Sequence, residues 1–359
     1  MTMKIFLRII ALFALLLTGV ACKHVTFESG GSSCAYAKYF DIQKIALSDS
    51  DSVNAVVTIS PYTGYRDTLI IEEPLDNIIC MSSSQVAGLA SIDADSVISA
   101  VSGLRYVTNP KLHQRNIPDI GYESSLDYET ILSLNPDLLL TYTVSGAEPP
   151  FISRLRSLGV RVLVLHDHLE EHPLARAEYI RLYGSLTGRE EYSDSVYTSI
   201  LSRYAFLKDM VDSNLPGKKV LMNIPYGDAW YIPGGNSYMA CLISDAGGEI
   251  LGARSGESRS RIITLEEAYR LSLSADIWLN PGPCRTKGEL VDFHHAFHMF
   301  GPIEKGLPIY SNALRMTPEG GNDFWESGSV RPDLILQDLI SIFSGDTHDD
   351  SLEYHFQVK

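Results

Sequence analysis

Two groups of side chains in the second half of this 359-residue sequence could bind metals or anions. The first is a histidine cluster, because His294 and His298, four residues apart on a helix, could chelate zinc or ligate haem iron. However, His295 stands where the H-E-x-x-H motif of zinc proteases carries its glutamate. Phe293 and Phe297 indicate a packed segment. We therefore keep an exported metal-dependent hydrolase using His294 and His298 as an alternative hypothesis and do not expect it to be the main function.

The second group is the arginine pair Arg259 and Arg261, just before an expected helix. Guanidinium groups bind carboxylates and the oxygens of catecholates or hydroxamates through paired hydrogen bonds. The pair could therefore bind the anionic groups of a ligand. Two solvated loop arginines are the alternative. Gly234 and Gly235 also precede a helix, but no G-x-G-x-x-G or G-K-[ST] motif follows, so they indicate a tight turn.

Residues 1–22 have the form of an export signal. Lys4 and Arg8 precede an apolar run at residues 9–17 that is too short to span a bilayer. Residues 18–22 resemble the lipobox of bacterial lipoproteins, although Gly19 stands where leucine is usual. We expect a protein on the periplasmic side of a bacterial membrane, lipid-anchored through Cys22. A signal peptide that is cleaved elsewhere is the alternative.

The net charge of the chain argues against one class of partner. A formal net charge of −15 repels nucleic-acid phosphates, so nucleic acid is not expected as a partner.

Of the remaining cysteines, Cys241 and Cys284 are the pair whose disulfide we would test first, because an exported location permits one. Cys80 lies in an apolar run and is expected to be a buried thiol. The absence of a C-x-x-C spacing argues against a zinc ribbon or redox motif.

Two similar stretches, residues 126–143 and 264–280, each predict a short helix followed directly by a buried strand. Asp127 or Ser125 can cap the first helix, and Pro136 ends it before an apolar parallel strand at residues 138–140. In the second, Thr264 and Glu267 form a possible capping box. Strands and helices alternate on both sides of a long helical region, which predicts α/β lobes with mostly parallel sheets.

The same patterns predict the domain boundaries. A β-hairpin is expected around residues 61–64, and the periodicity after residue 173 is helical over about 35 residues, or roughly 50 Å. The divisions expected are a signal peptide at 1–22, a tether at 23–52, an N-terminal lobe at 53–168, a bridging helix at 169–217, a C-terminal lobe at 218–346 and a polar tail at 347–359.

The chain resembles the solute-binding proteins of ATP-binding-cassette (ABC) importers, in the class that carries iron chelates and cobalamin. The similar segments are D-Y-E…N-P-D at 127–137, L-G-V-R-V at 158–162, G-R-E at 188–190, the helix start and A-G-G stop at 235–248, and R-P-D at 331–333. The resemblance implies two Rossmann-like lobes joined by one long rigid helix, with a ligand cleft between them and no enzymatic activity. It also implies a monomer without a resident cofactor, which captures a ferric siderophore, haem or cobalamin for a permease and its ATPase. A lipoprotein with a purely structural role is a further alternative.

A cleft of this kind uses aromatic faces and a few hydrogen-bond donors at the carboxyl ends of strands. With 19 tyrosines in the chain, packing is the alternative role for any one of them. The expected ligand-binding residues are Ser83, Tyr106, Tyr122 and Tyr142 in the first lobe, and Trp230, Tyr231, Tyr238, Arg259, Arg261 and Trp325 in the second.

The resemblance also implies that one glutamate on each lobe docks onto arginines of the permease. Glu129 matches the first. The second falls on Glu266 or Glu267, and Glu266 is preferred because Glu267 has a competing role in capping its helix. Glutamates placed at helix starts by the macrodipole alone are the alternative.

Overall fold

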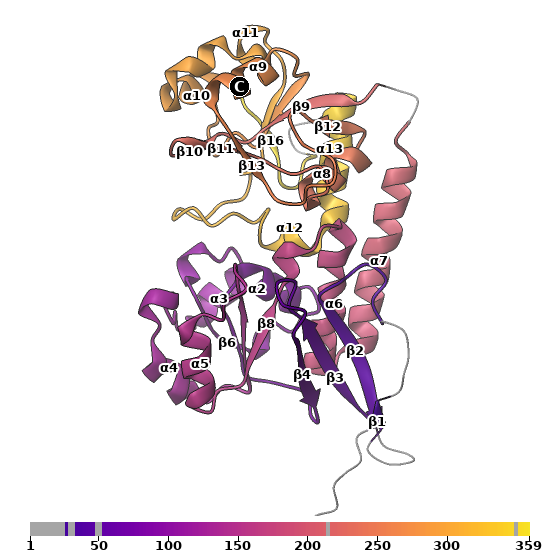
Figure 1. Cartoon of the computed structure of the whole chain (residues 1–359), viewed down its shortest axis with the longest axis vertical. Coiled ribbons are helices and arrows are strands. Elements are labelled where there is room, and N and C mark those ends of the chain that lie inside the picture. The colour runs from indigo at the N-terminus through magenta and orange to yellow at the C-terminus, as the bar shows by residue number, and fades with distance from the viewer. Residues whose placement is uncertain (1–25, 28–32, 47–51, 213–215, 348–350) are drawn as a thin grey trace, which may run out of the picture.

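The computed structural model describes residues 26–27, 33–46, 52–212, 216–347 and 351–359. Two α/β lobes lie one above the other along the longest axis, and a pair of helices runs along one side (Figure 1). The predicted α/β class with mostly parallel sheets is confirmed. The predicted signal peptide and Cys22 lie outside the described residues. Among the helices that are described, none is both long and apolar enough to cross a membrane.

The N-terminal lobe is built on a four-stranded parallel sheet in the order β6-β5-β7-β8. Leu138, Leu139 and Leu140 in its centre are fully buried, as the uninterrupted apolar run predicts. The Asp127 side chain caps the helix at residues 128–134, which precedes this strand, by accepting the Thr130 N–H. Asn135, in a left-handed conformation, ends that helix. The elements are β5 (Ile78–Cys80), β6 (Ile98–Val101), β7 (Leu138–Tyr142), β8 (Val162–Leu165), α2 (Ser83–Ala90), α3 (Pro110–Arg115), α4 (Tyr128–Leu134) and α5 (Pro150–Ser157).

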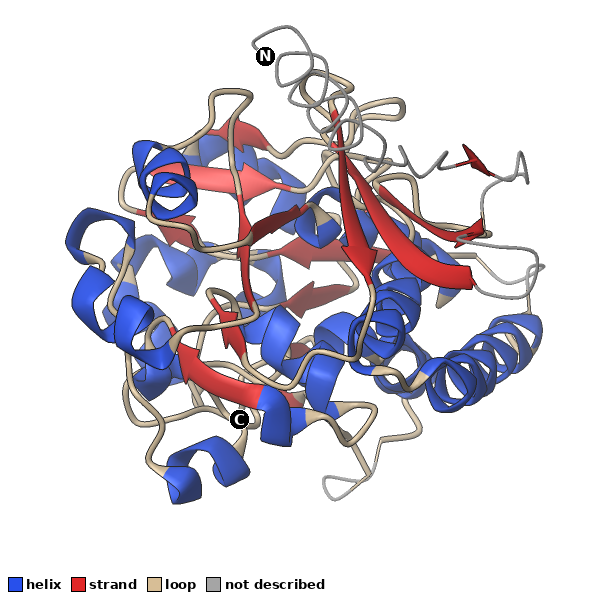
Figure 2. Ribbon diagram, turned by 90° about the horizontal axis from the view of Figure 1, so that it is seen from below, coloured by secondary structure: helices blue, strands red, loops and turns tan. Residues whose placement is uncertain are grey.

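A separate antiparallel sheet precedes this lobe. It has the order β1-β2-β3-β4, with bounds β1 (Thr26–Phe27), β2 (Phe40–Ala46), β3 (Ser52–Ile59) and β4 (Arg66–Ile71). The β3–β4 hairpin confirms the prediction. The tether expected at residues 23–52 is wrong over its described second half, because β2 pairs with β3 along its whole length. The buried Glu178 carboxylate also accepts the N–H groups of residues 35–37, which holds the segment before β2 against the helix that carries Glu178. Figure 2 shows the long strands of this sheet beside the long helices.

The connection between the lobes is a hairpin of two helices, which corrects the expected single bridging helix. Gly188, in a left-handed conformation, ends α6 (Pro173–Thr187), and α7 (Glu190–Asp209) returns alongside it. A Cβ at Gly184 would collide with Ser193, so the two helices approach closely there. Helix α6 packs on the N-terminal lobe, and α7 continues past it to the C-terminal lobe (Figure 1).

The C-terminal lobe has a five-stranded sheet in the order β12-β9-β14-β15-β16 and a small sheet β10-β11-β13. The polar tail expected at residues 347–359 is wrong over residues 351–359, because β16 pairs antiparallel with β15 and Leu352, Tyr354 and Val358 are buried. The elements are β9 (Lys218–Met222), β10 (Pro225–Tyr226), β11 (Ala229–Ile232), β12 (Gly248–Ile250), β13 (Arg261–Ile263), β14 (Ile277–Leu279), β15 (Ile309–Ser311), β16 (Phe356–Gln357), α8 (Tyr238–Asp245), α9 (Leu265–Ser272), α10 (Lys287–Phe293), α11 (Gly301–Glu304), α12 (Ser327–Val330) and α13 (Pro332–Ser344).

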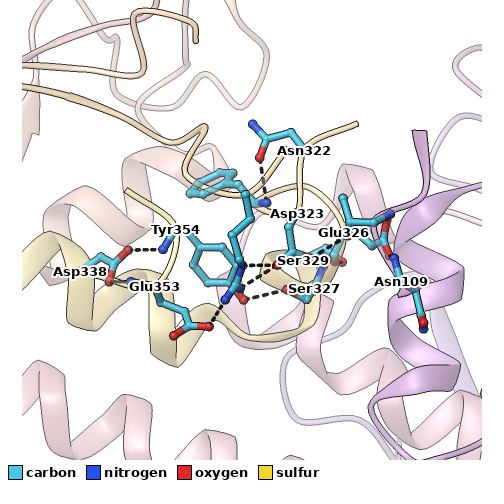
Figure 3. A network of polar contacts seen from close by, with 12 residues as sticks. Asn109, Asn322, Asp323, Glu326, Ser327, Ser329, Asp338, Glu353 and Tyr354 are labelled. Carbon is cyan, nitrogen blue, oxygen red and sulfur yellow. Dashed lines mark hydrogen bonds and ion pairs between the residues drawn. The ribbon is translucent and has the colours of Figure 1, made fainter. Parts of the chain in front are cut away.

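A segment at residues 314–326, which we call the strap, forms a second connection between the lobes. The buried Glu326 carboxylate accepts the backbone N–H groups of Thr108 at 2.6 Å and Asn109 at 2.9 Å (Figure 3). Asp323 accepts the Thr108 hydroxyl at 3.0 Å. A Cβ at Gly321 would collide with the backbone of Tyr106, so only glycine allows this approach. The strap therefore fixes the distance between the lobes beside the cleft.

Candidate ligand cleft between the lobes

A cavity of about 750 Å³ at the carboxyl ends of β7 and β8, which we call the main cleft cavity, is lined by both lobes. Tyr62, Val144 and His168 come from the N-terminal side, and Tyr238 and Trp325 from the C-terminal side. His168 lies in a short 3-10 helix (Asp167–Leu169) directly after β8, and Val144 follows β7. The carboxyl ends of parallel strands thus open into the cleft, the usual position for ligands in α/β folds.

A second cavity of about 510 Å³ lies at the same edge of the N-terminal sheet. It is lined by Ser83, Tyr106, Tyr122 and Tyr142, the four residues predicted in this lobe. Tyr106 and Tyr122 are 39% and 41% exposed, so their rings are available to a ligand. The ring centroids of Tyr142 and His168 are 5.6 Å apart, which places the two cavities side by side.

Three of the residues predicted in the C-terminal lobe line the main cavity: Tyr238, Arg259 and Trp325. Trp325 is 48% exposed, whereas Tyr238 is almost buried. The Arg176 guanidinium lies 3.9 Å from the centroid of the Tyr238 ring, a cation–π contact inside the cavity wall. Tyr238 therefore forms the cavity wall together with Arg176, a residue that was not among those predicted.

Two predicted ligand residues, Trp230 and Arg261, are wrong. Trp230 is 1% exposed, stacks with Trp278 and Phe300, and donates its indole N–H to the Met222 carbonyl. It is a core residue because β11 turns it into the lobe.

Arg261 donates to the Gly252 carbonyl at 2.7 Å and to the Glu267 carboxylate at 2.7 Å. The guanidinium lowers the pKa of Glu267, so both charges are already paired. Tyr231, also predicted, is 40% exposed but lines neither of the two cleft cavities.

The histidines that follow β8 have an unusual environment. His166 is buried, and burial lowers its pKa to about 4. Burial also lowers the pKa of His168, against an opposing effect of Asp167. Neither ring nitrogen of His168 makes a well-formed hydrogen bond within the described residues. Both imidazoles are therefore neutral at pH 7, and the two buried nitrogens of His168 are polar atoms without a well-formed partner in the cavity wall.

Charged groups in the cavity wall leave a positive excess. The Glu170 carboxylate accepts the backbone N–H groups of Lys38 and Tyr39, and burial raises its pKa to about 7. Glu171 pairs with the Lys38 ammonium at 2.8 Å. By contrast, the Nε of the lining residue Arg176 has no hydrogen-bond partner in the part of the chain that the structure describes.

Sequence reasoning missed Tyr39, Tyr62, His168 and Arg176 in this cavity. His168 had a usable signal, because an H-D-H sequence directly follows the apolar strand at residues 162–165. Tyr39 and Tyr62 had none, since they reach the cleft only through the antiparallel sheet packed against α6.

The predicted docking glutamates are both exposed and lie in the first turns of α4 and α9. Glu129 follows the capping residue Asp127. Glu266 is unpaired by any salt bridge among described residues, whereas Glu267 is held by Arg261. This difference agrees with the choice of Glu266, because Glu267 has a structural partner.

The cysteine and histidine hypotheses also change. Cys241 and Cys284 are free thiols, so the disulfide considered for them is not formed, and Cys80 is fully buried as expected. The histidine cluster does not lie on one α-helix: α10 ends at Phe293, and residues 295–299 form a 3-10 helix. His294 Nδ1 accepts the Ala296 N–H, and His294 and His298 do not share the face of one α-helix that the alternative i, i+4 chelate needs.

The architecture of two α/β lobes around a cleft is matched by a known family. Residues 78–288, more than half of the chain, match the family described as periplasmic binding protein. The chain belongs to the periplasmic binding protein family. Members of this family bind a small-molecule solute outside the cytoplasm and deliver it to an ABC permease, and they are not enzymes.

Individual relatives are distant. An uncharacterized lipoprotein of Methanocaldococcus jannaschii is 23% identical over 286 residues, which is 76% of this chain and 66% of that protein, slightly under two thirds of its length. A periplasmic haem-binding protein from Pseudomonas aeruginosa has a TM-score of 0.59 at 18% identity, over 79% of this chain and 98% of that one. A periplasmic vitamin B12-binding protein from Vibrio cholerae has a TM-score of 0.57 at 14% identity, over 76% and 97%. At these identities the likeness to solved structures concerns the fold.

Proposed function

We propose that this member of the periplasmic binding protein family captures an anionic iron complex, haem or a ferric siderophore, in the cleft and delivers it to an ABC permease. The observation that carries the proposal is His168, a neutral imidazole without a well-formed hydrogen bond among described residues, beside the Tyr142 ring at the cavity edge. Imidazole nitrogen and phenolate oxygen are both ligands of haem iron.

The charge of the cavity wall supports an anionic ligand. Arg259 and Arg176 line the cavity, while Glu170 and Glu171 are held by the segment around Lys38. Guanidinium groups at a partly enclosed site suit propionates, catecholates or hydroxamates. The exposed rings of Tyr106, Tyr122 and Trp325 add apolar faces for a planar ligand.

A corrinoid is the second candidate, because the same three exposed rings suit a large, partly apolar macrocycle. The two ligands make different demands on the site. Ligation through His168 and pairing with Arg259 favour haem, whereas binding that depends on the rings alone favours cobalamin.

Titration with haemin, cyanocobalamin and a ferric siderophore tests the proposal. We expect haemin to shift its Soret band and quench tryptophan fluorescence. We also expect His168→Ala to weaken haemin binding at least about tenfold, equivalent to about 1.4 kcal/mol. Saturation at a hundredfold excess over Kd should stabilise the fold by about 2.7 kcal/mol.

His298→Ala is the matched control, because His298 is an exposed histidine far along the chain from the cleft residues and lines neither cleft cavity. Its haemin binding should equal that of the wild type. Unchanged affinity in both His168→Ala and Tyr142→Phe would contradict iron ligation at this edge. No binding of any of the three ligands would contradict the proposal as a whole.

Delivery and anchoring complete the proposal. Glu129 and Glu266 are proposed to dock onto the permease, supported by their exposure and by their place at the start of one helix in each lobe. Lipid attachment at Cys22 would keep the protein at the membrane. Charge reversal of both glutamates should reduce uptake and leave the ligand affinity in solution unchanged. A loss of ligand affinity that parallels the loss of uptake would contradict a docking role.

A further inference from the structure

A second cluster with metal-ligand chemistry lies outside the cleft, where the helical hairpin meets the C-terminal lobe. It consists of His172, the residue before α6, and of Cys241 and Asp245 on α8. One ligand atom from each residue lies within 4.8 Å of the other two. None of the three lines the main cleft cavity. We propose that these residues form a binding site for a divalent metal ion of the Zn²⁺ class.

The geometry is close to that of a zinc site. Cys241 and Asp245 are four residues apart on one helix, so they share a face, and their Sγ and Oδ2 atoms are 3.8 Å apart. Zn–S bonds of about 2.3 Å and Zn–N or Zn–O bonds of about 2.0–2.2 Å place tetrahedral ligand atoms about 3.5 Å from each other. Metal binding therefore requires the ligand atoms, which lie within 4.8 Å of one another, to move closer by up to about 1.3 Å. A thiolate, an imidazole and a carboxylate suit Zn²⁺ or Co²⁺ and leave a fourth position for water.

The groups around the cluster are those that hold metal ligands in place. The Tyr204 hydroxyl donates to Asp245 Oδ2 at 2.7 Å, and Lys208 pairs with Asp245 Oδ1 at 2.8 Å. The ring of Tyr36 lies 4.6 Å from that of His172. Hydrogen bonds to a ligating carboxylate orient it and increase its affinity. Lys208, in contrast, is a cation that competes with the metal for the same carboxylate.

Metal binding also competes with the capping of α6. His172 Nδ1 now accepts the Leu174 N–H at 3.1 Å. A metal on Nδ1 displaces that hydrogen bond directly. A metal on Nε2 removes it as well, because a neutral metal-bound imidazole carries its proton on Nδ1. The Leu174 amide therefore reports on metal occupancy at His172, whichever nitrogen is used.

Proton release gives a further signature. Burial raises the pKa of the Cys241 thiol to about 12, with Asp245 adding to the effect, so the thiol is protonated before the metal binds. Burial lowers the pKa of His172, which keeps the imidazole neutral. Binding of the metal to the thiolate then releases the Cys241 proton.

The experiment is a titration of the metal-free protein with Co²⁺ and Zn²⁺. We expect a sulfur-to-cobalt charge-transfer band with a stoichiometry of one, displacement by Zn²⁺, and a shift or faster exchange of the Leu174 amide. Cys241→Ser should abolish the charge-transfer band. His172→Asn should weaken Zn²⁺ binding at least about tenfold, and asparagine keeps an acceptor that can cap α6. Lys208→Gln should strengthen binding, because it removes the competing cation.

Cys284→Ser is the matched control, since Cys284 is also a partly buried free thiol of the C-terminal lobe. Its Co²⁺ spectrum should equal that of the wild type. The proposal is overturned if no Co²⁺ or Zn²⁺ binds, or if the binding survives Cys241→Ser and His172→Asn but is lost in His294→Ala or His298→Ala. The readouts need no cleft ligand, so they are independent of the proposed transport function.

Discussion

At the scale of single residues, Glu326 is the side chain whose ionisation bears most directly on the junction between the lobes. Its carboxylate is 3% exposed and accepts two backbone N–H groups from the other lobe. Burial raises its pKa to about 7, and the N–H donors of Thr108 and Asn109 only partly offset this. Because the folded pKa exceeds the unfolded value of about 4.3, the stabilising contribution is complete below pH 4 and is lost as the pH rises through 7.

Glu326→Gln should remove this pH dependence. From pH 5 to pH 8, the wild type should lose about 1–3 kcal/mol more of its free energy of unfolding than the variant does. The reason is that one unit of pKa shift corresponds to about 1.4 kcal/mol. Urea denaturation at both pH values measures it. Glu319→Gln, at an exposed position of the strap, is the control and should show the wild-type dependence. Parallel pH profiles for wild type and Glu326→Gln would contradict the prediction.

Residue types alone identified part of each wall of the cleft: four residues of the N-terminal lobe and three of the C-terminal lobe line the two cavities. Tyr106, Tyr122 and Tyr142 follow parallel strands or the loops at their ends, where position along the chain fixes position in space. Trp230 was misplaced because the small sheet β10-β11-β13 turns its side chain inward. Arg261 was wrongly assigned to the cleft because its guanidinium pairs with Glu267 in the first turn of α9. Such pairings depend on tertiary contacts that spacing does not encode.

At the scale of elements, the segment that leads into β16 is held to the C-terminal lobe by a buried carboxylate. Asp338 on α13 accepts the N–H groups of Glu353, Tyr354 and His355, and its Oδ2 lies 2.9 Å from His355 Nδ1. Asp338 is 1% exposed and His355 is fully buried. This side chain explains why an apparently polar terminal segment returns to the sheet edge.

Asp338→Ala should therefore leave several buried donors without an acceptor. Because each such donor costs about 1–3 kcal/mol, we expect a loss of at least about 2 kcal/mol in the free energy of unfolding. Asp346→Ala, at an exposed aspartate shortly after the same helix, is the control and should stay within about 0.5 kcal/mol of the wild type. Equal denaturation midpoints for the two variants would show that Asp338 does not hold β16.

The elements themselves were largely predictable, and the errors came from packing. Apolar runs such as residues 138–140 and capping residues such as Asp127 and Thr264 fixed strands and helix starts. Gly188 was seen as a break in a helix, but only the close contact of Gly184 with Ser193 makes that break a hairpin. The terminal strand was missed because a two-residue strand carries no periodicity.

At the scale of the whole molecule, two connections hold the lobes beside the cleft. Helix α7, of 20 residues, is about 30 Å long and packs against α13 of the C-terminal lobe. The strap lies against the N-terminal lobe through Glu326 and Gly321, and the Thr317 hydroxyl donates to the Arg105 carbonyl at 2.9 Å. A hinge in α7 alone could not move the lobes apart without also breaking the strap contacts.

This arrangement predicts little closure on ligand binding. By small-angle X-ray scattering, the radius of gyration of the wild type should change by less than about 1 Å when haemin is added to saturation, as in other pre-organised complexes. Loosening the strap should change this. In a Thr317→Ala, Gly321→Ala variant, the new Cβ at residue 321 collides with the Tyr106 backbone, and the two hydrogen bonds of the Thr317 hydroxyl are lost. That variant should be larger without ligand and should contract more on binding.

Gly288→Ala is the matched control, because a Cβ there meets only the Thr286 hydroxyl at 3.7 Å and alanine favours the first turn of α10. It should scatter as the wild type does, with and without haemin. A contraction of more than about 2 Å in the wild type would mean that the lobes move as hinged bodies despite the strap. The strap contacts made by Glu326 and Gly321 would then belong to the ligand-bound state alone.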